Sequence, residues 1–293
     1  MTSSNSGLSN NTRGILCLIA SAFCFALMST FIRLSGDLPT TQKAFFRNLV
    51  ALIFALIMLR KEKIPLRPHD KKNIPALLAR SICGTIGILE NFYAVDHLVL
   101  SDASMLNKMS PFFAVLFSFI ILKERLTLFQ AFTIAAAFLG SLFVIKPTAG
   151  IFSSVPALAG FVGGIGAGAA YAALRYAGSH GEKGPFIVAF FSGFSTLFFL
   201  PFFIFDFHPM TLTQLVLLLC AGLSAAGGQM TITAAYTYAP AKEISVYDYT
   251  QLIFTMLIGY FVFGDVPDKW SFVGYFIIIA AAFAAFEHNR KKA

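Results

Sequence analysis

Ten long apolar runs take up almost the whole chain, and they constrain its fold more than any other feature. Each run has the length of about 20 residues that a helix needs to cross the hydrocarbon core of a bilayer. The segments between the runs are short and carry charges, Gly or Pro, which is typical of turns. The sequence therefore predicts an all-α integral membrane protein with ten transmembrane helices. The expected helices cover residues 14–35, 42–60, 74–96, 101–122, 127–146, 154–176, 186–206, 212–237, 242–264 and 269–287.

The amino-acid composition supports a lipid environment. Hydrophobic residues make up 57% of the 293 residues and charged residues only 12%, whereas soluble domains carry about a quarter charged residues. A net charge of +8 would suggest nucleic-acid binding in a soluble protein, but membrane proteins collect Lys and Arg in their cytoplasmic loops. We therefore expect no nucleic-acid partner. The four cysteines form no CxxC pair, so we expect neither a disulfide nor a metal site, and no cofactor.

The distribution of basic residues predicts the orientation of the chain. With the N-terminus in the cytoplasm, fifteen Lys and Arg residues fall on the inner side and four on the outer side. Because cytoplasmic loops are enriched in Lys and Arg, we expect a multi-pass protein of the cell (inner or plasma) membrane with both termini in the cytoplasm. Residues 1–13 then form a polar tail that is not a signal peptide, and residues 289–293 form a basic C-terminal tail.

An internal repeat emerges when segment 92–145 is set against segment 232–286. With a shift of about 141 residues, both run without a gap from a polar start through a long apolar stretch and a charged turn to a final apolar helix. We predict two repeats of five helices each, at 14–147 and 154–288. Because five is odd, the second repeat enters the bilayer upside down, which is the plan of many carriers.

This pattern resembles the EamA-type ten-helix carriers of the drug/metabolite transporter superfamily. The segment 245–268, SVYDYTQLIFTMLIGYFVFGDVPD, carries the strongest likeness, and segments 44–47 and 98–111 also fit. The likeness covers nearly the whole chain. It implies a carrier whose substrate cavity lies at the midplane between the two halves. Members of this family move amino acids, nucleotide-like compounds, riboflavin, organic cations and other metabolites.

Five ionisable residues fall inside the predicted helices, namely Arg47, Arg80, Glu90, Lys108 and Asp248. Each costs about 2.5 kcal/mol or more in the membrane, so each should face a partner or a wet cavity. Counting about 1.5 Å per residue along each helix places Arg47, Glu90 and Lys108 in the outer third of the membrane. The same count places Arg80 and Asp248 in the inner third. Snorkelling toward the membrane surface is the alternative for the two arginines.

When the two repeats are aligned, polar residues of one half correspond to chemically different residues of the other half. Lys108 corresponds to Tyr249, and Glu90 corresponds to Thr231. A symmetric scaffold with asymmetric side chains suits a cavity for an asymmetric solute, although hydrogen bonds that serve only helix packing are the alternative. The predicted substrate-binding and coupling residues are Arg47, Arg80, Glu90, Asn91, Asn107, Lys108, Ser110, Gln229, Thr231, Tyr247, Asp248, Tyr249 and Gln251.

These features predict a secondary active transporter, an exporter or exchanger that works by alternating access. In the outer layer, Arg47 and Lys108 outweigh Glu90, which favours a small polar organic metabolite that is anionic or zwitterionic. An amino acid, a carboxylate or a nucleotide-like compound fits this description. Glu90 is the candidate for proton coupling, while exchange against a counter-substrate and a homodimeric assembly stay open.

Two other functions stay open at this point. A cation or drug exporter of the same fold would use Glu90 and Asp248 to recruit its solute. A non-enzymatic scaffold or flippase subunit would present a polar seam to lipid. An enzyme is not expected, because the chain carries no nucleophile elbow, no HExxH and no phosphate-cradling glycine loop.

Overall fold

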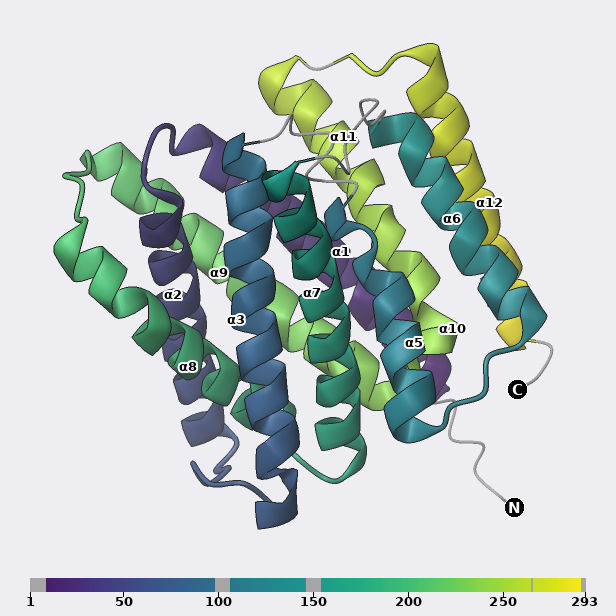
Figure 1. Cartoon of the computed structure of the whole chain (residues 1–293), viewed down its shortest axis with the longest axis horizontal. Helices are drawn as coiled ribbons and strands as arrows, with labels where there is room; N and C mark the ends of the chain where they lie inside the picture. The colour runs from purple at the N-terminus through teal and green to yellow at the C-terminus, as the bar shows by residue number, and fades with distance from the viewer. Residues whose placement is uncertain (1–8, 98–105, 146–153, 265, 291–293) are drawn as a thin grey trace, which may run out of the picture.

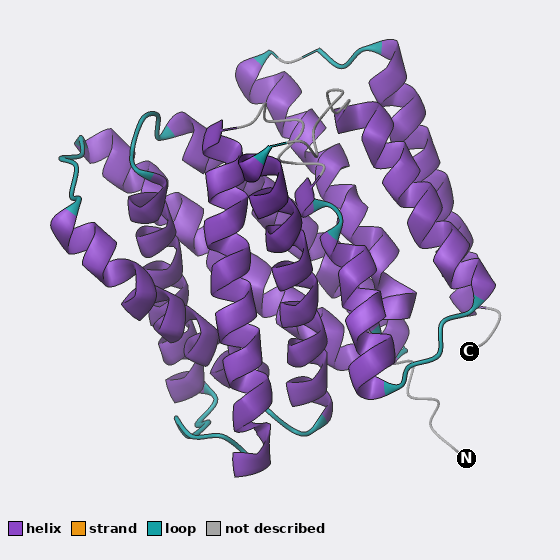
Figure 2. Cartoon of the chain, in the orientation of Figure 1, coloured by secondary structure: helices purple, strands orange, loops and turns teal. Residues whose placement is uncertain are grey.

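The computed structural model describes residues 9–97, 106–145, 154–264 and 266–290, and every regular element in these ranges is helical (Figure 1; Figure 2). The helices are α1 (Asn10–Leu34), α2 (Thr40–Lys61), η1 (Lys71–Asn73), α3 (Ile74–His97), α5 (Ser110–Leu122), α6 (Leu128–Ile145), α7 (Val155–Ser179), α8 (Gly184–Phe205), α9 (Leu212–Tyr238), α10 (Ala241–Ile244), η3 (Ser245–Tyr249), α11 (Thr250–Phe263) and α12 (Lys269–Arg290).

Eight helical segments in the described part of the chain are long and apolar enough to cross a membrane. One of them, Ala241–Phe263, is made of α10, η3 and α11. Two further passages complete the set. The first is α3, whose polar residues lower its hydropathy, and the second ends with the 13-residue α5. The prediction of an all-α membrane protein with ten helices is therefore confirmed.

Successive membrane passages run antiparallel, so their connections gather at two ends of the bundle (Figure 1). The connections α2–α3, α5–α6, α7–α8 and α9–α10 lie at the end where α1 begins and α12 ends. We call this end the basic end, because the α2–α3 connection alone brings six Lys and Arg residues to it over positions 60–72. Both described termini of the helical bundle lie at this end as well.

The two halves pack through each other rather than side by side. In the first half the five passages are α1, α2, α3, α5 and α6, and their counterparts are α7, α8, α9, α11 and α12. The helix α1 packs on α9, and its counterpart α7 packs on α3. Likewise α5 packs on α7 and α11 packs on α1, while α2 and α6 pack on their own counterparts, α8 and α12. The packing thus has the two-fold pattern of the repeat, and its main contacts join one half to the other.

Glycines on α7 allow this close packing. A methyl group at Gly163 would lie 3.1 Å from the Asn91 backbone nitrogen on α3. A methyl group at Gly164 would lie 2.7 Å from the Leu106 carbonyl oxygen. Small residues let helix backbones approach each other in a membrane, where no hydrophobic effect drives association. The glycine face of α7 is therefore a packing surface for α3 and for the segment before α5.

The fourth and ninth apolar runs are not the continuous α-helices predicted from the sequence. In the first half, Lys108 and Met109 form a turn, and α5 begins only at Ser110. In the second half, α10 ends at Ile244 and a 3-10 segment, η3, leads into α11. With the shift of about 141 residues these interruptions coincide. Apolar periodicity could not predict them, because a break changes the backbone without changing the hydrophobicity of the run.

Candidate functional site

The two helix interruptions meet, and their polar residues bond across the repeat. The Lys108 ammonium (Nζ) lies 3.2 Å from the Asp248 carboxylate oxygen Oδ2. It also donates to the Gln251 side-chain oxygen at 2.7 Å and to the Asp248 carbonyl oxygen at 3.3 Å. The Tyr249 hydroxyl donates in return to the Lys108 carbonyl oxygen at 2.9 Å. We call these four residues the paired cluster.

The local backbone explains why this cluster can form. In a continuous helix, the Lys108 carbonyl oxygen would accept a hydrogen bond from a backbone N–H of the next turn. The turn at Lys108 leaves this oxygen to accept from the Tyr249 hydroxyl instead. Pro111, in the first turn of α5, lacks an N–H and suits a helix that starts here. Lys108 is 5% exposed and Asp248 is 8% exposed, so each charge needs the other in a low-dielectric interior.

This pair corrects the predicted depth layers. Lys108 was expected in the outer third and Asp248 in the inner third, yet their side chains touch and share one layer. The count assumed continuous α-helices that rise about 1.5 Å per residue. The turn at Lys108 and Met109 and the 3-10 segment η3 break this assumption in both runs.

Arg80 lies inside the helix bundle, where it bonds to α9. Its Nη2 donates to the Gln229 side-chain oxygen at 2.9 Å, and its guanidinium carbon lies 4.0 Å from the centre of the Phe191 ring. Gly84 makes the room, because a methyl group there would lie 2.5 Å from Arg80 Nη1. With 3% of its surface exposed, Arg80 does not snorkel to the membrane surface. Its Nε has no hydrogen-bond partner among the described residues.

Arg47 is a second buried guanidinium without a carboxylate partner in the described part of the chain. Its Nε lies 3.3 Å from the sulfur of Met28, and its Nη1 lies 3.3 Å from the Asn48 side-chain oxygen. Both contacts are to neutral groups, so neither cancels the charge. The Arg80 guanidinium carbon also lies 5.9 Å from the centre of the Tyr171 ring on α7.

Tyrosines form a wall beside these charges. The Tyr171 and Tyr236 rings stack with their centres 5.2 Å apart and their planes at 12°. Among the described residues, buried hydroxyl oxygens without a hydrogen-bond partner occur on Ser118, Ser192, Thr233 and Tyr247. Buried polar atoms are nearly always hydrogen-bonded, so each of these hydroxyls is a point where a ligand or a water molecule would supply the missing bond.

The remaining predicted residues do not all join this site. Thr231 donates to the Gly227 carbonyl oxygen of its own helix at 2.8 Å, which fits the packing alternative. Glu90 and Asn91 lie on α3 where it packs on Gly163 of α7, and Glu90 is only half-buried. The ion-pair partner of Lys108 in the described part of the chain is Asp248 and not Glu90. Ser110 is buried at the start of α5, and Asn107, half-buried, precedes the turn.

A second ion pair lies toward the basic end and was not predicted. Arg175, near the end of α7, donates from Nε to the Glu124 carboxylate at 3.2 Å. Its Nη1 donates to the carbonyl oxygens of Tyr236 and Thr237 at 3.1 and 2.9 Å, at the end of α9. We call this contact the basic-end latch, because it joins α7, α9 and the α5–α6 connection. The repeat offered a signal for it, since Arg175 matches Arg33.

The fold and the site define a class of protein. Ten membrane passages in two inverted halves, with helix interruptions that meet around buried charges, are the features of a membrane carrier. The model of the EamA-like transporter family matches residues 12–146 and 155–286. The chain therefore belongs to the EamA-like transporter family, with one family domain in each half, and is a multi-pass membrane transporter and not an enzyme.

Relatives across bacteria support the same assignment. The chain is 30% identical over 273 residues to the pseudopaline exporter CntI of Pseudomonas aeruginosa, covering 92% of this chain and 95% of that protein. It is 25% identical over 289 residues to a riboflavin transporter of Vibrio cholerae, covering 96% and 95% of the two chains. A solved structure described only as "Crystal structure of protein" superposes with a TM-score of 0.80 at 13% identity, covers 96% of this chain and 98% of that one, and shows a shared fold.

Proposed function

We propose that this protein is a secondary active transporter that exports or exchanges a small polar organic metabolite bearing at least one negative charge, either an anion or a zwitterion. The observation that carries the proposal is the pair of buried guanidinium groups, Arg47 and Arg80, which have no carboxylate partner in the described part of the chain. Lys108 does not add to this excess, because Asp248 neutralises it. The excess positive charge that the sequence assigned to Arg47 and Lys108 is therefore assigned to Arg47 and Arg80.

The chemistry of these groups supports a carboxylate as their ligand. A guanidinium presents several N–H donors in a planar fork and binds carboxylate or phosphate in a bidentate manner. Burying such a charge in the membrane is costly, and an anionic solute offsets that cost while it is bound. The Gln229 side chain, which accepts a hydrogen bond from Arg80, supplies a further hydrogen-bonding group beside that arginine.

Two features support alternating access. The interruptions in α5 and α10–η3–α11 give each half a hinge at matched positions. The basic-end latch closes one end of the bundle in the conformation described here. We place the basic end in the cytoplasm of the cell membrane because Lys and Arg concentrate on that side. The relative named an exporter supports outward movement, and half-buried Glu90 is our candidate for coupling to protons.

The test compares probes that differ in charge. Thermal unfolding of the purified full chain is followed with glutamate and citrate as the zwitterionic and anionic probes, riboflavin as the neutral probe and putrescine as the dication, because a ligand of the folded state raises its apparent stability. We expect stabilisation by one of the anionic or zwitterionic probes. This stabilisation should be lost in Arg47→Gln and Arg80→Gln. It should be retained in part in Arg47→Lys and Arg80→Lys, which keep the positive charge. Stabilisation by putrescine alone, unaffected by these substitutions, would support a cation exporter and overturn the proposal.

A further inference from the structure

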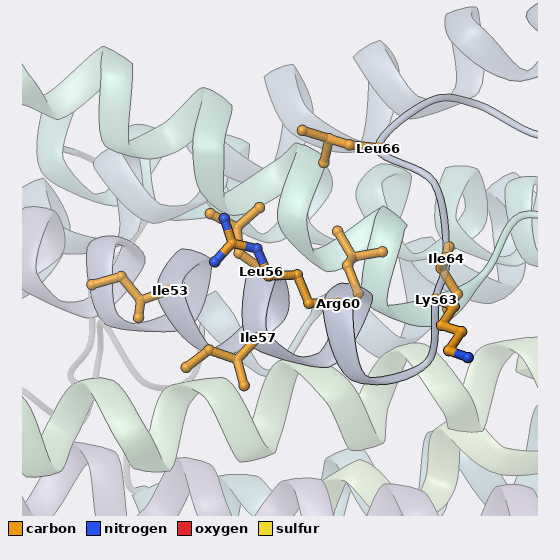
Figure 3. A pocket seen from close by; sticks show the side chains of 8 residues that line it. Ile53, Leu56, Ile57, Arg60, Lys63, Ile64 and Leu66 are labelled. Carbon is orange, nitrogen blue, oxygen red and sulfur yellow. The ribbon is translucent and has the colours of Figure 1, made fainter.

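A cavity of about 490 Å³ lies on the outside of the bundle, at the end of α2 (Figure 3). Its apolar wall includes Ile53 and Ile57, one turn apart on α2, together with Ile64 and Leu66 beyond the helix end. The exposed fractions of Ile53 and Ile57 are 49% and 56%, so this wall faces away from the bundle. In a membrane, such a wall is in contact with acyl chains.

Two cations complete the lining of this cavity. Figure 3 shows the Arg60 side chain extending back along α2, over Leu56, and Lys63 just past the end of the helix. Side chains on a helix point toward its N-terminus, so Arg60 is directed toward the membrane rather than away from it. In the described part of the chain, neither Arg60 nor Lys63 has an ion-pair partner.

The backbone at Lys63 is unusual and gives a second, independent observation. Lys63 has φ of +55°, a left-handed conformation that favours glycine. It closes a Schellman motif, in which the Ile64 nitrogen donates to the Leu59 carbonyl at 2.9 Å and the Lys63 nitrogen to the Arg60 carbonyl at 3.2 Å. Glycine would occupy this position without strain, so a lysine here adds charge at a cost in stability.

We propose that this cavity binds an anionic phospholipid of the membrane leaflet at the basic end. The apolar wall on α2 would hold the upper part of an acyl chain, and Arg60 and Lys63 would hold the phosphate of the headgroup. Charge complementarity selects this occupant, because segment 60–72 carries six Lys or Arg residues against two acidic residues. Basic pockets beside transmembrane helices are suited to anionic headgroups. None of the lining residues belongs to the candidate functional site, and the proposal does not depend on the proposed function.

The experiment uses the delipidated full chain in a neutral detergent. Thermal unfolding is followed while phosphatidylglycerol, phosphatidylcholine or sn-glycerol-3-phosphate is added. We expect phosphatidylglycerol alone to raise the unfolding temperature by several degrees. The variant Arg60→Gln/Lys63→Gly should weaken its apparent affinity by about fivefold for each cation removed. Because Lys63→Gly relieves the left-handed strain, this variant should fold at least as well as the parent.

A matched control is available at another helix end. Lys123 is the only other non-glycine residue with positive φ in the described ranges, and it also follows a helix at the basic end. The control variant Lys123→Gly/Arg125→Gln removes the same two charges and the same type of strain, away from the cavity. It should keep the full response to phosphatidylglycerol. An equal response to phosphatidylcholine or glycerol phosphate, or an equal loss in both double variants, would overturn the proposal.

Discussion

The two helix interruptions occupy matched positions in the two halves, but they are built differently. The first is a turn at Lys108 and Met109, and it contributes a cation. The second is the 3-10 segment η3, and it contributes a carboxylate together with Tyr249. Duplication accounts for the matched positions of the two interruptions. The side chains that differ between the two halves account for the ion pair between them. A scaffold with two-fold symmetry thus acquires one asymmetric, charge-neutral junction.

The strongest test of this comparison removes one side of the junction. Lys108→Ala leaves the buried Asp248 without its ammonium partner, so the free energy of unfolding should fall by about 3 kcal/mol or more. Unfolding of the purified protein in mixed detergent micelles measures this change. The double variant Lys108→Ala/Asp248→Ala removes both charges and should recover part of the loss. If the losses of Lys108→Ala and Asp248→Ala simply added up in the double variant, the pair would not be coupled.

The next test turns to the arginine that the repeat does not duplicate, because the same shift sets Arg80 against Ala221. In Gly84→Ala, the added methyl group would lie 2.5 Å from Arg80 Nη1 and 2.8 Å from the Phe191 ring. Overpacking of this kind should lower the free energy of unfolding by about 2 kcal/mol and displace the guanidinium.

The control for this test is a glycine that has space for an added methyl group. A methyl group at Gly193 would meet its nearest neighbour, Leu52, at 3.6 Å, an ordinary contact. Gly193→Ala should therefore unfold like the parent and keep any stabilisation by anionic probes. If Gly84→Ala behaved like Gly193→Ala in both measurements, the assigned position of Arg80 would be wrong.

A smaller effect distinguishes the helix ends that follow the two interruptions. Lys123 at the end of α5 has φ of +55°, and its counterpart Gly264 at the end of α11 has φ of +72°. Because only glycine adopts this conformation without strain, Lys123→Gly should raise the free energy of unfolding by about 1 kcal/mol, and Gly264→Ala should lower it by a similar amount. Thermal unfolding at constant salt compares the two, and changes of the same sign would contradict the symmetry of these ends.

The smallest expected effect concerns a single hydroxyl. Tyr249→Phe removes the hydrogen bond to the Lys108 carbonyl and should cost about 0.6 kcal/mol of unfolding free energy. Tyr247 is the matched control, because its buried hydroxyl has no partner among the described residues. Tyr247→Phe should leave stability unchanged or higher. A loss of probe binding without a loss of stability in this variant would favour a role for Tyr247 at the ligand.

The sequence predicted the architecture because apolar length and an ungapped repeat report directly on membrane passages. It predicted the buried charges as well, since a cation such as Lys108 inside an apolar run needs an explanation. It did not predict how they pair. Depth counting treats each run as a straight α-helix, and the turn and the 3-10 segment that bring Lys108 and Asp248 together leave no trace in hydrophobicity. Tyr171 was missed because its contacts with Tyr236 and Arg80 depend on how the helices pack, not on its own neighbours in sequence.

The interleaving of the halves has a consequence for biosynthesis. The main packing partners of α1, α2, α3 and α6 are α9, α8, α7 and α12, all of which the ribosome makes later. After the first five passages have left the translocation channel, their buried faces still lack a protein partner, and Arg80 has no Gln229 to bond. A nascent chain of this design completes its tertiary structure only after the last helix emerges. Premature termination should therefore leave a fragment that is inserted but unpacked, and open to membrane proteases.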